Sequence, residues 1–209
     1  MFKPMKTQKI SDCMYVINSG IVNFYIYDTG DELLVFDTGM GKGFAKAGFK
    51  KLGLDYNRVT HVFLTHSDFD HISGYKLFGK AKVYLAEKET AMISGGKARA
   101  FGIVHNAKRN LNDFVLLADK EVVSVGNVNI QLIYTPGHTV GSSMYTINDS
   151  ILVGGDTISI KGNKEVGCFS FVQNMDHKAN VNLVQKLNSE HFFDKFSLIV
   201  TGHYGILKR

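Results

Sequence analysis

Four side chains that can bind a metal ion lie within six residues, directly after an apolar run that ends at Leu64. They are His66, Asp68, Asp70 and His71. Imidazoles and carboxylates crowded in this way repel one another or stay partly desolvated unless a cation compensates them. The segment therefore predicts a metal site at the point where a strand ends and the chain turns.

Three more polar side chains of the same kind stand at the ends of later apolar runs. They are His138 in Thr-Pro-Gly-His-Thr, Asp156 in Gly-Gly-Asp-Thr and His203 in Thr-Gly-His-Tyr. Together the seven residues offer enough nitrogen and oxygen donors for two metal ions, with coordination positions left for water. The set indicates a metalloenzyme.

The bulk composition is that of a globular protein. The 209 residues are 44% hydrophobic and 21% charged, and this length fits one large domain or two halves that share a core. The formal net charge of +5 comes from scattered basic residues, which favours an anionic small-molecule substrate over nucleic acid. With no signal-peptide pattern and no apolar run of about 18 residues, we expect a cytoplasmic protein that does not contact a membrane.

Apolar runs separated by turn residues predict the elements that position these side chains. Strands are expected over 14–17, 23–27, 33–36, 59–64, 82–86, 121–125, 128–134, 143–147, 151–153 and 198–201. Helices are expected over 41–52, 70–78, 87–93 and 177–188, the last with Asp176 as its N-cap. Residues 94–113 are glycine-rich, basic and without a regular period, so we predict a long functional loop there.

Both halves of the chain follow the same plan of several strands, a helix and a strand that ends in ligand-type residues. This plan predicts an α/β (α+β) protein with two β-rich layers, each covered by a helix on its outer side. We expect a single domain over residues 1–209, with similar halves of about 1–115 and 116–209.

The ordered segments resemble the metallo-β-lactamase superfamily. Its signature is Thr-His-x-His-x-Asp-His, followed by a distant His, an Asp and a final His, and segment 65–71 matches it together with His138, Asp156 and His203. Asp37-Thr-Gly also occurs in its expected place. Segments in the right order across the whole chain are far more specific than a single short motif. The resemblance implies a four-layer αββα sandwich.

The resemblance also implies how the seven donors divide between two divalent ions. The first position would be held by His66, Asp68 and His138, the second by Asp70, His71 and His203, and Asp156 would bridge both. Zinc is the expected metal, with iron or manganese as alternatives. Asp68 departs from the family pattern, because it stands where a second histidine is usual. A carboxylate shifts the preference of the first position towards iron or manganese, and the flavodiiron branch carries one there.

The activity implied by the resemblance is a dinuclear metal-dependent hydrolase acting on a small ester, thioester, lactone or phosphoester. Metal-bound hydroxide would attack the substrate, and Asp70 would orient this nucleophile. Segment 135–142 resembles that of thioester hydrolases of the glyoxalase II type. One alternative is an iron-dependent oxidoreductase, flavodiiron-like or persulfide dioxygenase-like, which Asp68 favours and the absence of a flavin domain after Arg209 disfavours. The other is an RNA-processing nuclease, which the basic charge permits, although no basic stripe carries stacking aromatics.

Residues beside the motif are expected to support the metal ligands rather than to bind metal themselves. Asp37 either holds a ligand histidine or caps a turn. Thr139 and Ser142 are expected to fix a tight turn, and Tyr204 is expected to pack rather than to bind an oxyanion. Gly154 and Gly155 are expected to allow a close backbone approach to the metal centre.

The remaining polar and aromatic candidates lie in loops or outside the motif. Those placed at the surface, with an anion contact as the alternative, are His105, Lys108 and Arg109. Those without an assigned role are His61, His177 and His191. Cys13 and Cys168 form no CxxC pair and are predicted as buried, reduced thiols. Phe169 and Phe171 are candidates for the contact of a homodimer.

Overall fold

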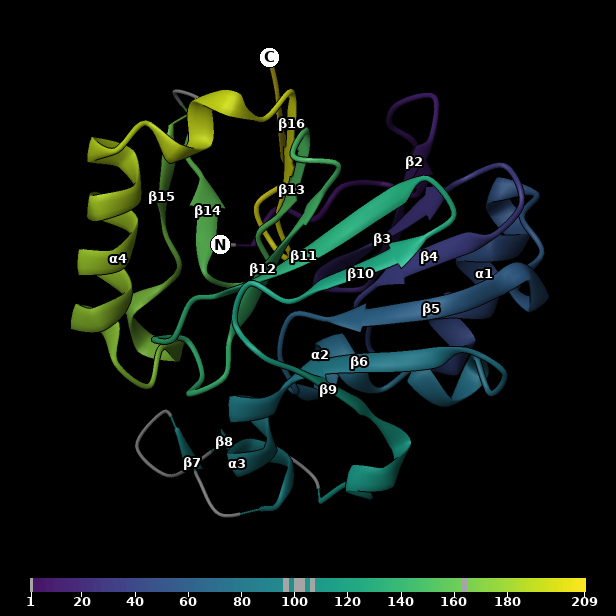
Figure 1. Ribbon diagram of the computed structural model, residues 1–209, viewed down its shortest axis with the longest axis horizontal. Coiled ribbons are helices and arrows are strands. Elements are labelled where there is room, and N and C mark those ends of the chain that lie inside the picture. Colours follow the sequence, from purple (N-terminus) through teal and green to yellow (C-terminus); the bar gives the residue numbers. More distant parts are fainter. Residues whose placement is uncertain (1, 96–97, 100–103, 106–107, 163–164) are drawn as a thin grey trace.

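The computed structural model describes residues 2–95, 98–99, 104–105, 108–162 and 165–209. Two β-sheets pack face to face, and a helix covers the outer side of each, as Figure 1 shows with α1 and α4 on opposite flanks. The layers are therefore αββα, as the sequence predicts. In the described part of the chain, no helix is long and apolar enough to cross a lipid bilayer.

The first sheet has seven strands in the order β1-β2-β3-β4-β5-β6-β9. Their bounds are β1 Gln8–Lys9, β2 Met14–Ser19, β3 Val22–Asp28, β4 Leu33–Phe36, β5 Val59–Leu64, β6 Lys82–Ala86 and β9 Val115–Leu117. The strands from β4 to β9 run parallel, and α1 (Lys42–Leu52) connects β4 to β5. Parallel neighbours need such a crossover because a tight hairpin cannot join them.

The second sheet has six strands in the order β10-β11-β12-β13-β16-β17. Their bounds are β10 Val122–Val125, β11 Val128–Tyr134, β12 Ser143–Ile147, β13 Ile151–Val153, β16 Leu198–Val200 and β17 Ile206–Lys208. β13 and β16 are parallel, and between them come α4 (His177–Ser189) and the ribbon of β14 (Ile158–Ile160) and β15 (Val166–Cys168). The side chain of Asp176 accepts a hydrogen bond from Ala179 N, so the predicted N-cap of α4 is confirmed.

Successive side chains of a strand point to opposite faces of its sheet, so the apolar side chains are divided among three cores. The core between the sheets contains residues of both, including Phe63 and Tyr145. A second core lies between the first sheet and α1, where Phe49 is fully buried. A third lies between the second sheet and α4, where Val184 packs. These cores fix the sheets rigidly behind the loops at the strand ends.

Three local predictions need correction. The helix expected over 70–78 is split into α2 (Phe69–Ile72) and a 3-10 helix (Tyr75–Leu77). The break falls at Gly74, where an added Cβ would lie 2.3 Å from the carbonyl oxygen of Thr38. Segment 87–93 begins as a 3-10 helix, η3 (Glu87–Glu89), before α3 (Thr90–Ile93). Both thiols are free, as predicted, but they are half-buried rather than buried.

The predicted loop 94–113 has regular structure in its described parts. β7 (Ala98–Arg99) pairs with β8 (Val104–His105), and a 3-10 helix spans Leu111–Asp113. Residues 96–97, 100–103 and 106–107 lie outside the described residues. The short strands β1, β9, β14, β15 and β17 were also missed, because a run of two or three residues rarely shows a period by itself.

Candidate metal centre

The candidate ligands gather at one edge of the two sheets because they follow strand ends. His66 lies two residues after β5, and Asp156 and His203 each lie three residues after β13 and β16. Carboxyl ends of parallel strands meet at the same edge of a sheet. His138 follows β11, which lies beside β12 in the second sheet. All seven candidates are buried.

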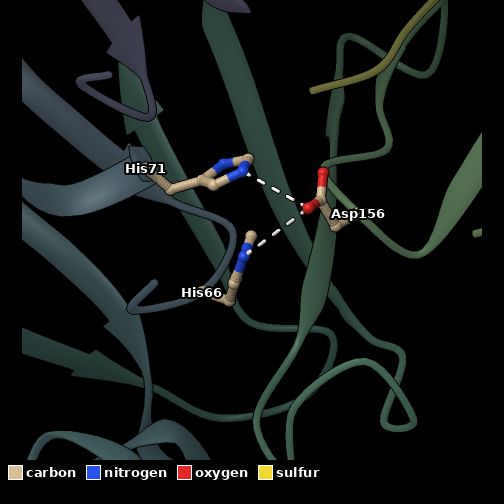
Figure 2. A group of neighbouring side chains, drawn as sticks. All are labelled: His66, His71 and Asp156. Carbon is tan, nitrogen blue, oxygen red and sulfur yellow. Dashed lines mark ion pairs between the residues drawn. The ribbon is translucent and has the colours of Figure 1, made fainter. Parts of the chain in front are cut away.

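The donor atoms form three groups whose members lie within 4.8 Å of one another. Two of the groups are the triplets His66–Asp68–His138 and Asp70–His71–His203, and the third is His66–His71–Asp156. Figure 2 shows the third group, with the imidazoles of His66 and His71 directed at one carboxylate oxygen of Asp156. Two of these groups have the same members as the two expected ligand sets, and the third places Asp156 beside one histidine of each.

Asp156 Oδ2 lies at the middle of the whole set. Its distances to the Nε2 atoms are 3.2 Å for His203, 3.4 Å for His71, 3.6 Å for His138 and 4.0 Å for His66. One oxygen therefore faces a nitrogen of every imidazole in the centre. This is the arrangement expected of a carboxylate that contacts two ions at once.

The carboxylate of Asp68 reaches the first triplet. Its Oδ2 lies 3.3 Å from His66 Nε2 and 3.2 Å from His138 Nε2. The carboxylate of Asp68 therefore reaches the Nε2 atoms of both imidazoles in this triplet. In the second triplet, Asp70 Oδ2 lies 3.3 Å from His203 Nε2 and 3.9 Å from His71 Nε2.

The other nitrogen of each imidazole has a partner that sets its tautomer. His71 Nδ1 donates to Asp37 Oδ2 at 2.9 Å, and His203 Nδ1 donates to the carbonyl of Ile21 at 2.7 Å. Because a carboxylate and a backbone carbonyl face these nitrogens, Nδ1 of each ring is the donor and carries the proton. The lone pair of Nε2 is then available to a metal ion.

The remaining two imidazoles are oriented in the same way. His66 Nδ1 lies 3.0 Å from the hydroxyl of Thr65, which itself donates to the carboxylate of Asp37. The hydroxyl is therefore left as an acceptor for His66. His138 Nδ1 lies 3.1 Å from Asn174 Oδ1. Asn174 is an orienting residue that the sequence analysis missed, because its loop has no ligand-type pattern.

Asp37 connects two of the ligand-bearing segments. Besides His71, it accepts from the backbone N–H of Thr65 at 2.8 Å. Its backbone is in the left-handed region with φ 60°, a conformation that an aspartate adopts at a cost and that marks functional sites. Of the two interpretations of Asp37, the structure therefore supports the partner of a ligand histidine.

The electrostatics of the centre depend on which charges surround each group. Burial lowers the pKa of His66 well below its usual value, and the imidazoles of His71 and His138 lower it further. Burial also lowers the pKa of His203, but Asp156 and Asp70 outweigh it and raise the value to about 9. Without a cation, the carboxylates therefore hold protons on the second triplet.

Burial and the neighbouring charges shift the pKa values of the carboxylates in the opposite direction. Burial raises the pKa of Asp156, but His203 and His71 lower it well below the usual range. For Asp70, burial again raises the pKa, and the same two imidazoles lower it overall. Both carboxylates are therefore ionised at neutral pH and carry the negative charge that a cation needs.

The residues fit a pair of metal ions. His71 Nε2 and His203 Nε2 face each other at 3.4 Å, and both would carry a lone pair in the neutral tautomers set by their Nδ1 partners. Two such lone pairs repel unless a proton or a cation lies between them. Among the described residues, His66 Nε2 and Asp156 Oδ1 are buried without a hydrogen-bond partner. Nitrogen and carboxylate donors in this number suit zinc, iron or manganese.

Close packing around the donors depends on glycines. An added Cβ at Gly155 would lie 2.6 Å from the hydroxyl of Thr65, which orients His66, whereas at Gly154 it would meet Ile158. Gly202 was not singled out from the sequence. Its added Cβ would lie 2.4 Å from Asp156 Oδ1, so the loop before His203 has room for glycine alone.

The structure also shows the contacts of the residues beside the motif. Ser142 Oγ accepts from Thr139 N at 2.8 Å, which confirms the tight turn. Tyr204 packs edge-on against Phe2 and Phe169, as expected. Phe169 is buried, with its ring 5.0 Å from that of His138, so it cannot serve a dimer contact, whereas Phe171 is exposed.

Three basic residues outside the ligand motif contact other side chains, and the side chain of a fourth lies outside the described residues. The guanidinium of Arg109 lies 5.6 Å from the ring of Tyr75. His177 Nδ1 contacts the amide of Asn174, which brings this half-buried residue into the network of His138. His191 pairs with Asp194 at the surface. The side chain of His105 lies outside the described residues.

Comparison with known proteins agrees with this geometry. The family model described as the metallo-beta-lactamase superfamily matches residues 17–203. This chain belongs to that superfamily. The fold agrees as well: a metallo-beta-lactamase family protein of Thermus thermophilus superposes with a TM-score of 0.68 and 21% identity, over 95% of this chain and 75% of that one.

Two curated relatives carry hydrolase names. A probable metallo-hydrolase of Methanocaldococcus jannaschii is 30% identical over 161 residues, which are 77% of this chain and 64% of that protein. A probable polyketide biosynthesis zinc-dependent hydrolase of Bacillus subtilis is 36% identical over 105 residues, 48% of this chain and 40% of that protein. The chain thus spans less than two-thirds of either relative. The hydrolase names belong to these relatives, with which the chain shares its superfamily.

Proposed function

We propose that this protein is a dinuclear metal-dependent hydrolase that acts on a small ester, thioester, lactone or phosphoester. The observation that carries the proposal is the place of Asp156 Oδ2, between 3.2 and 4.0 Å from the Nε2 atoms of all four imidazoles. A single bridging carboxylate flanked by two ligand triplets supports two adjacent ions rather than one.

Two bound divalent cations would lower the pKa of a water molecule and polarise the substrate oxygen that gains charge. The ligand roles proposed for the chain are His66, Asp68 and His138 at one position, Asp70, His71 and His203 at the other, and Asp156 between them. Asp37, Thr65, Asn174 and the Ile21 carbonyl hold the imidazoles in the tautomer that binds metal.

Asp70 has a second proposed role beside metal binding. It is ionised at neutral pH, because His71 and His203 lower its pKa. Its carboxylate retains more exposure than the other donors, at 8% for the residue. An ionised carboxylate at the open side of the centre accepts a hydrogen bond from the attacking water and orients it towards the substrate.

The substrate proposed is a small anionic molecule. The net charge of +5 favours the approach of anions. The name of the Bacillus subtilis relative supports hydrolysis and zinc as the first metal to test. Phe69, between Asp68 and Asp70 in the sequence, is an exposed apolar side chain, and it fits an apolar portion of such a substrate.

Metal analysis combined with a substrate panel tests the proposal. Protein expressed with zinc, iron and manganese supplied is analysed for metal content and assayed with aryl esters, acyl thioesters, lactones and phosphodiesters. We expect two equivalents of zinc and turnover of at least one class, lost in the His66→Ala and Asp70→Ala variants. Turnover that survives in both variants, or its absence on every class, would contradict the proposal.

Asp68 favours a second candidate function, an iron-dependent oxidoreductase. Its carboxylate is part of the first triplet, where it adds a hard oxygen donor to two imidazole nitrogens. Stoichiometric iron with a visible absorption band, together with oxygen or nitric oxide consumption, would support this function. Colourless zinc protein with esterase activity would exclude it.

A further inference from the structure

Glu89 is a buried charge that lies outside the ligand motif. It ends the 3-10 helix η3, directly after β6, and its side chain is completely buried. A carboxylate in such a place destabilises the fold by several kcal/mol unless donors surround it. The contacts of Glu89 show where these donors come from.

The two oxygens of Glu89 bind two different loops. Oε1 accepts from the backbone N–H of Ser67 at 2.8 Å and from its hydroxyl at 2.6 Å. Oε2 accepts from the hydroxyl of Thr139 at 2.7 Å and from the backbone N–H of Gly141 at 3.0 Å. One carboxylate thus joins loops that are far apart in the sequence.

Both loops carry donors of the first triplet. Ser67 stands between His66 and Asp68, and Thr139 directly follows His138. The bridge through Glu89 therefore fixes the distance between these three donors. The second triplet is held by other groups, namely Asp37 at His71 and the Ile21 carbonyl at His203.

The fit around Glu89 is tight. An added Cβ at Gly141 would lie 2.1 Å from the backbone nitrogen of Glu89, so the two segments are in direct contact. All four donors are N–H or O–H groups, and each needs an acceptor. A glutamine would turn one amide N–H₂ towards donors on one loop, and an aspartate would be too short to reach both loops.

We propose that Glu89 is a positioning residue for the first metal position, because it locks the loop of His66 and Asp68 to the loop of His138. This rests on the proposed function in taking these three residues as ligands. Loss of a residue that orients ligands typically weakens metal affinity by about 10–100-fold. The loss in a Glu89 variant should fall on one of the two metal equivalents.

Competition between metal-free protein and a chromophoric zinc chelator measures each equivalent without any substrate. We expect Glu89→Gln to weaken one equivalent by about 10–100-fold and to leave the other unchanged. The matched control is Glu87→Gln, an exposed position in the same 3-10 helix, which should leave both unchanged. Circular dichroism establishes whether each variant is folded.

If Glu89→Gln does not fold, Thr139→Val decides in its place, because it removes one donor from the bridge and keeps the carboxylate. We expect it to weaken the same equivalent. Equal loss at both equivalents, or no loss at either, in the folded variant would overturn the role of Glu89. The wild-type stoichiometry tests the proposed function separately. If the wild type binds a single ion and Glu89→Gln weakens the binding of that ion, the positioning role stands and the two-ion function is excluded. A wild type that binds no ion would overturn both.

Discussion

Each imidazole of the metal centre is oriented by a partner of a different chemical kind. His71 has the carboxylate of Asp37, His203 a backbone carbonyl, His66 a hydroxyl and His138 the amide of Asn174. A carboxylate raises the basicity of its imidazole most strongly, because it stabilises the ring when the ring carries positive charge. At the residue scale, Asp37 is therefore the orienting group with the largest expected effect on metal binding.

Asp37→Asn should weaken metal binding by about 10–100-fold, because the amide removes the charge next to His71 and its N–H₂ group cannot accept a hydrogen bond. Zinc competition with a chelator measures the loss. Asp31→Asn, at an exposed position before β4, is the control and should bind both equivalents as the wild type does. An affinity in Asp37→Asn equal to that of the control would contradict the assignment.

The protonation of His203 leads to a pH prediction for the metal-free protein. Its pKa of about 9 in the folded chain lies above the ordinary value of 6.5. The stability that this shift contributes is therefore fully present below pH 6.5 and is lost as the pH rises to about 9.

We expect the urea midpoint of metal-free protein to fall between pH 6.5 and 9. In the metal-loaded protein a cation replaces the proton, so the midpoint should not fall over this interval. Urea titrations of both forms at several pH values measure the difference. Midpoints that change in parallel in the two forms would show that the centre does not bind the proton.

At the element scale, the strand ends present the ligands and the helices hold the strands in place. α1 packs on β2 at Gly48, where an added Cβ would lie 2.2 Å from a methyl group of Ile17. The helix ends at Gly53, whose left-handed conformation lets its N–H bond to the carbonyl of Lys50. The close contact at Gly48 thus fixes the distance between the helix and the sheet that carries Asp37 and His66.

Gly48→Ala should lower the free energy of unfolding by about 1–3 kcal/mol, because the methyl group overpacks the interface with Ile17. Gly43→Ala is the matched control in the same helix, at an exposed position with nothing within 4 Å of the added Cβ. It should raise the stability by up to about 1 kcal/mol, since alanine loses less entropy in a helix. Urea unfolding of both variants checks the opposite signs.

At the scale of the whole molecule, each sheet reaches across to the ligand loops of the other. The hydroxyl of Tyr25, on the first sheet, donates to the carbonyl of Thr201 in the second at 2.7 Å. The hydroxyl of Tyr145, on the second sheet, donates to the carbonyl of Leu64 in the first at 3.0 Å. The candidate metal centre lies where these crossed contacts converge, so bound ions would join both sheets.

Removal of metal should therefore lower the stability of the whole fold. An ion that binds only the folded chain stabilises it by about 4 kcal/mol when free metal exceeds the dissociation constant a thousandfold. Thermal unfolding with and without a strong chelator measures the change. His66→Ala, which lacks one donor, should respond less than the wild type. A melting temperature that the chelator leaves unchanged would show that the centre holds no ion.

Much of the centre was predictable from local sequence. A strand shows its period over a few residues, and a ligand cluster directly after it requires a cation for electrostatic reasons, so the seven donors and the strands before them could be named. The layered fold followed from the ordered segments. Short strands such as β9 and β15 were not predicted, because a run of three residues rarely shows a hydrophobic period by itself. The helix break at Gly74 depended on a contact with Thr38 that lies far away in the chain.

The sequence by itself therefore determined which side chains are candidate metal ligands and on which strand ends they stand, because both depend on residue type and local spacing. The tertiary structure alone decided how close the donors lie to Asp156 and which residues orient them. Glu89 contacts Thr139 across 50 positions, and Asn174 contacts His138 across 36. Such partners have no spacing rule, since the packing of two sheets and not the local chain brings them together.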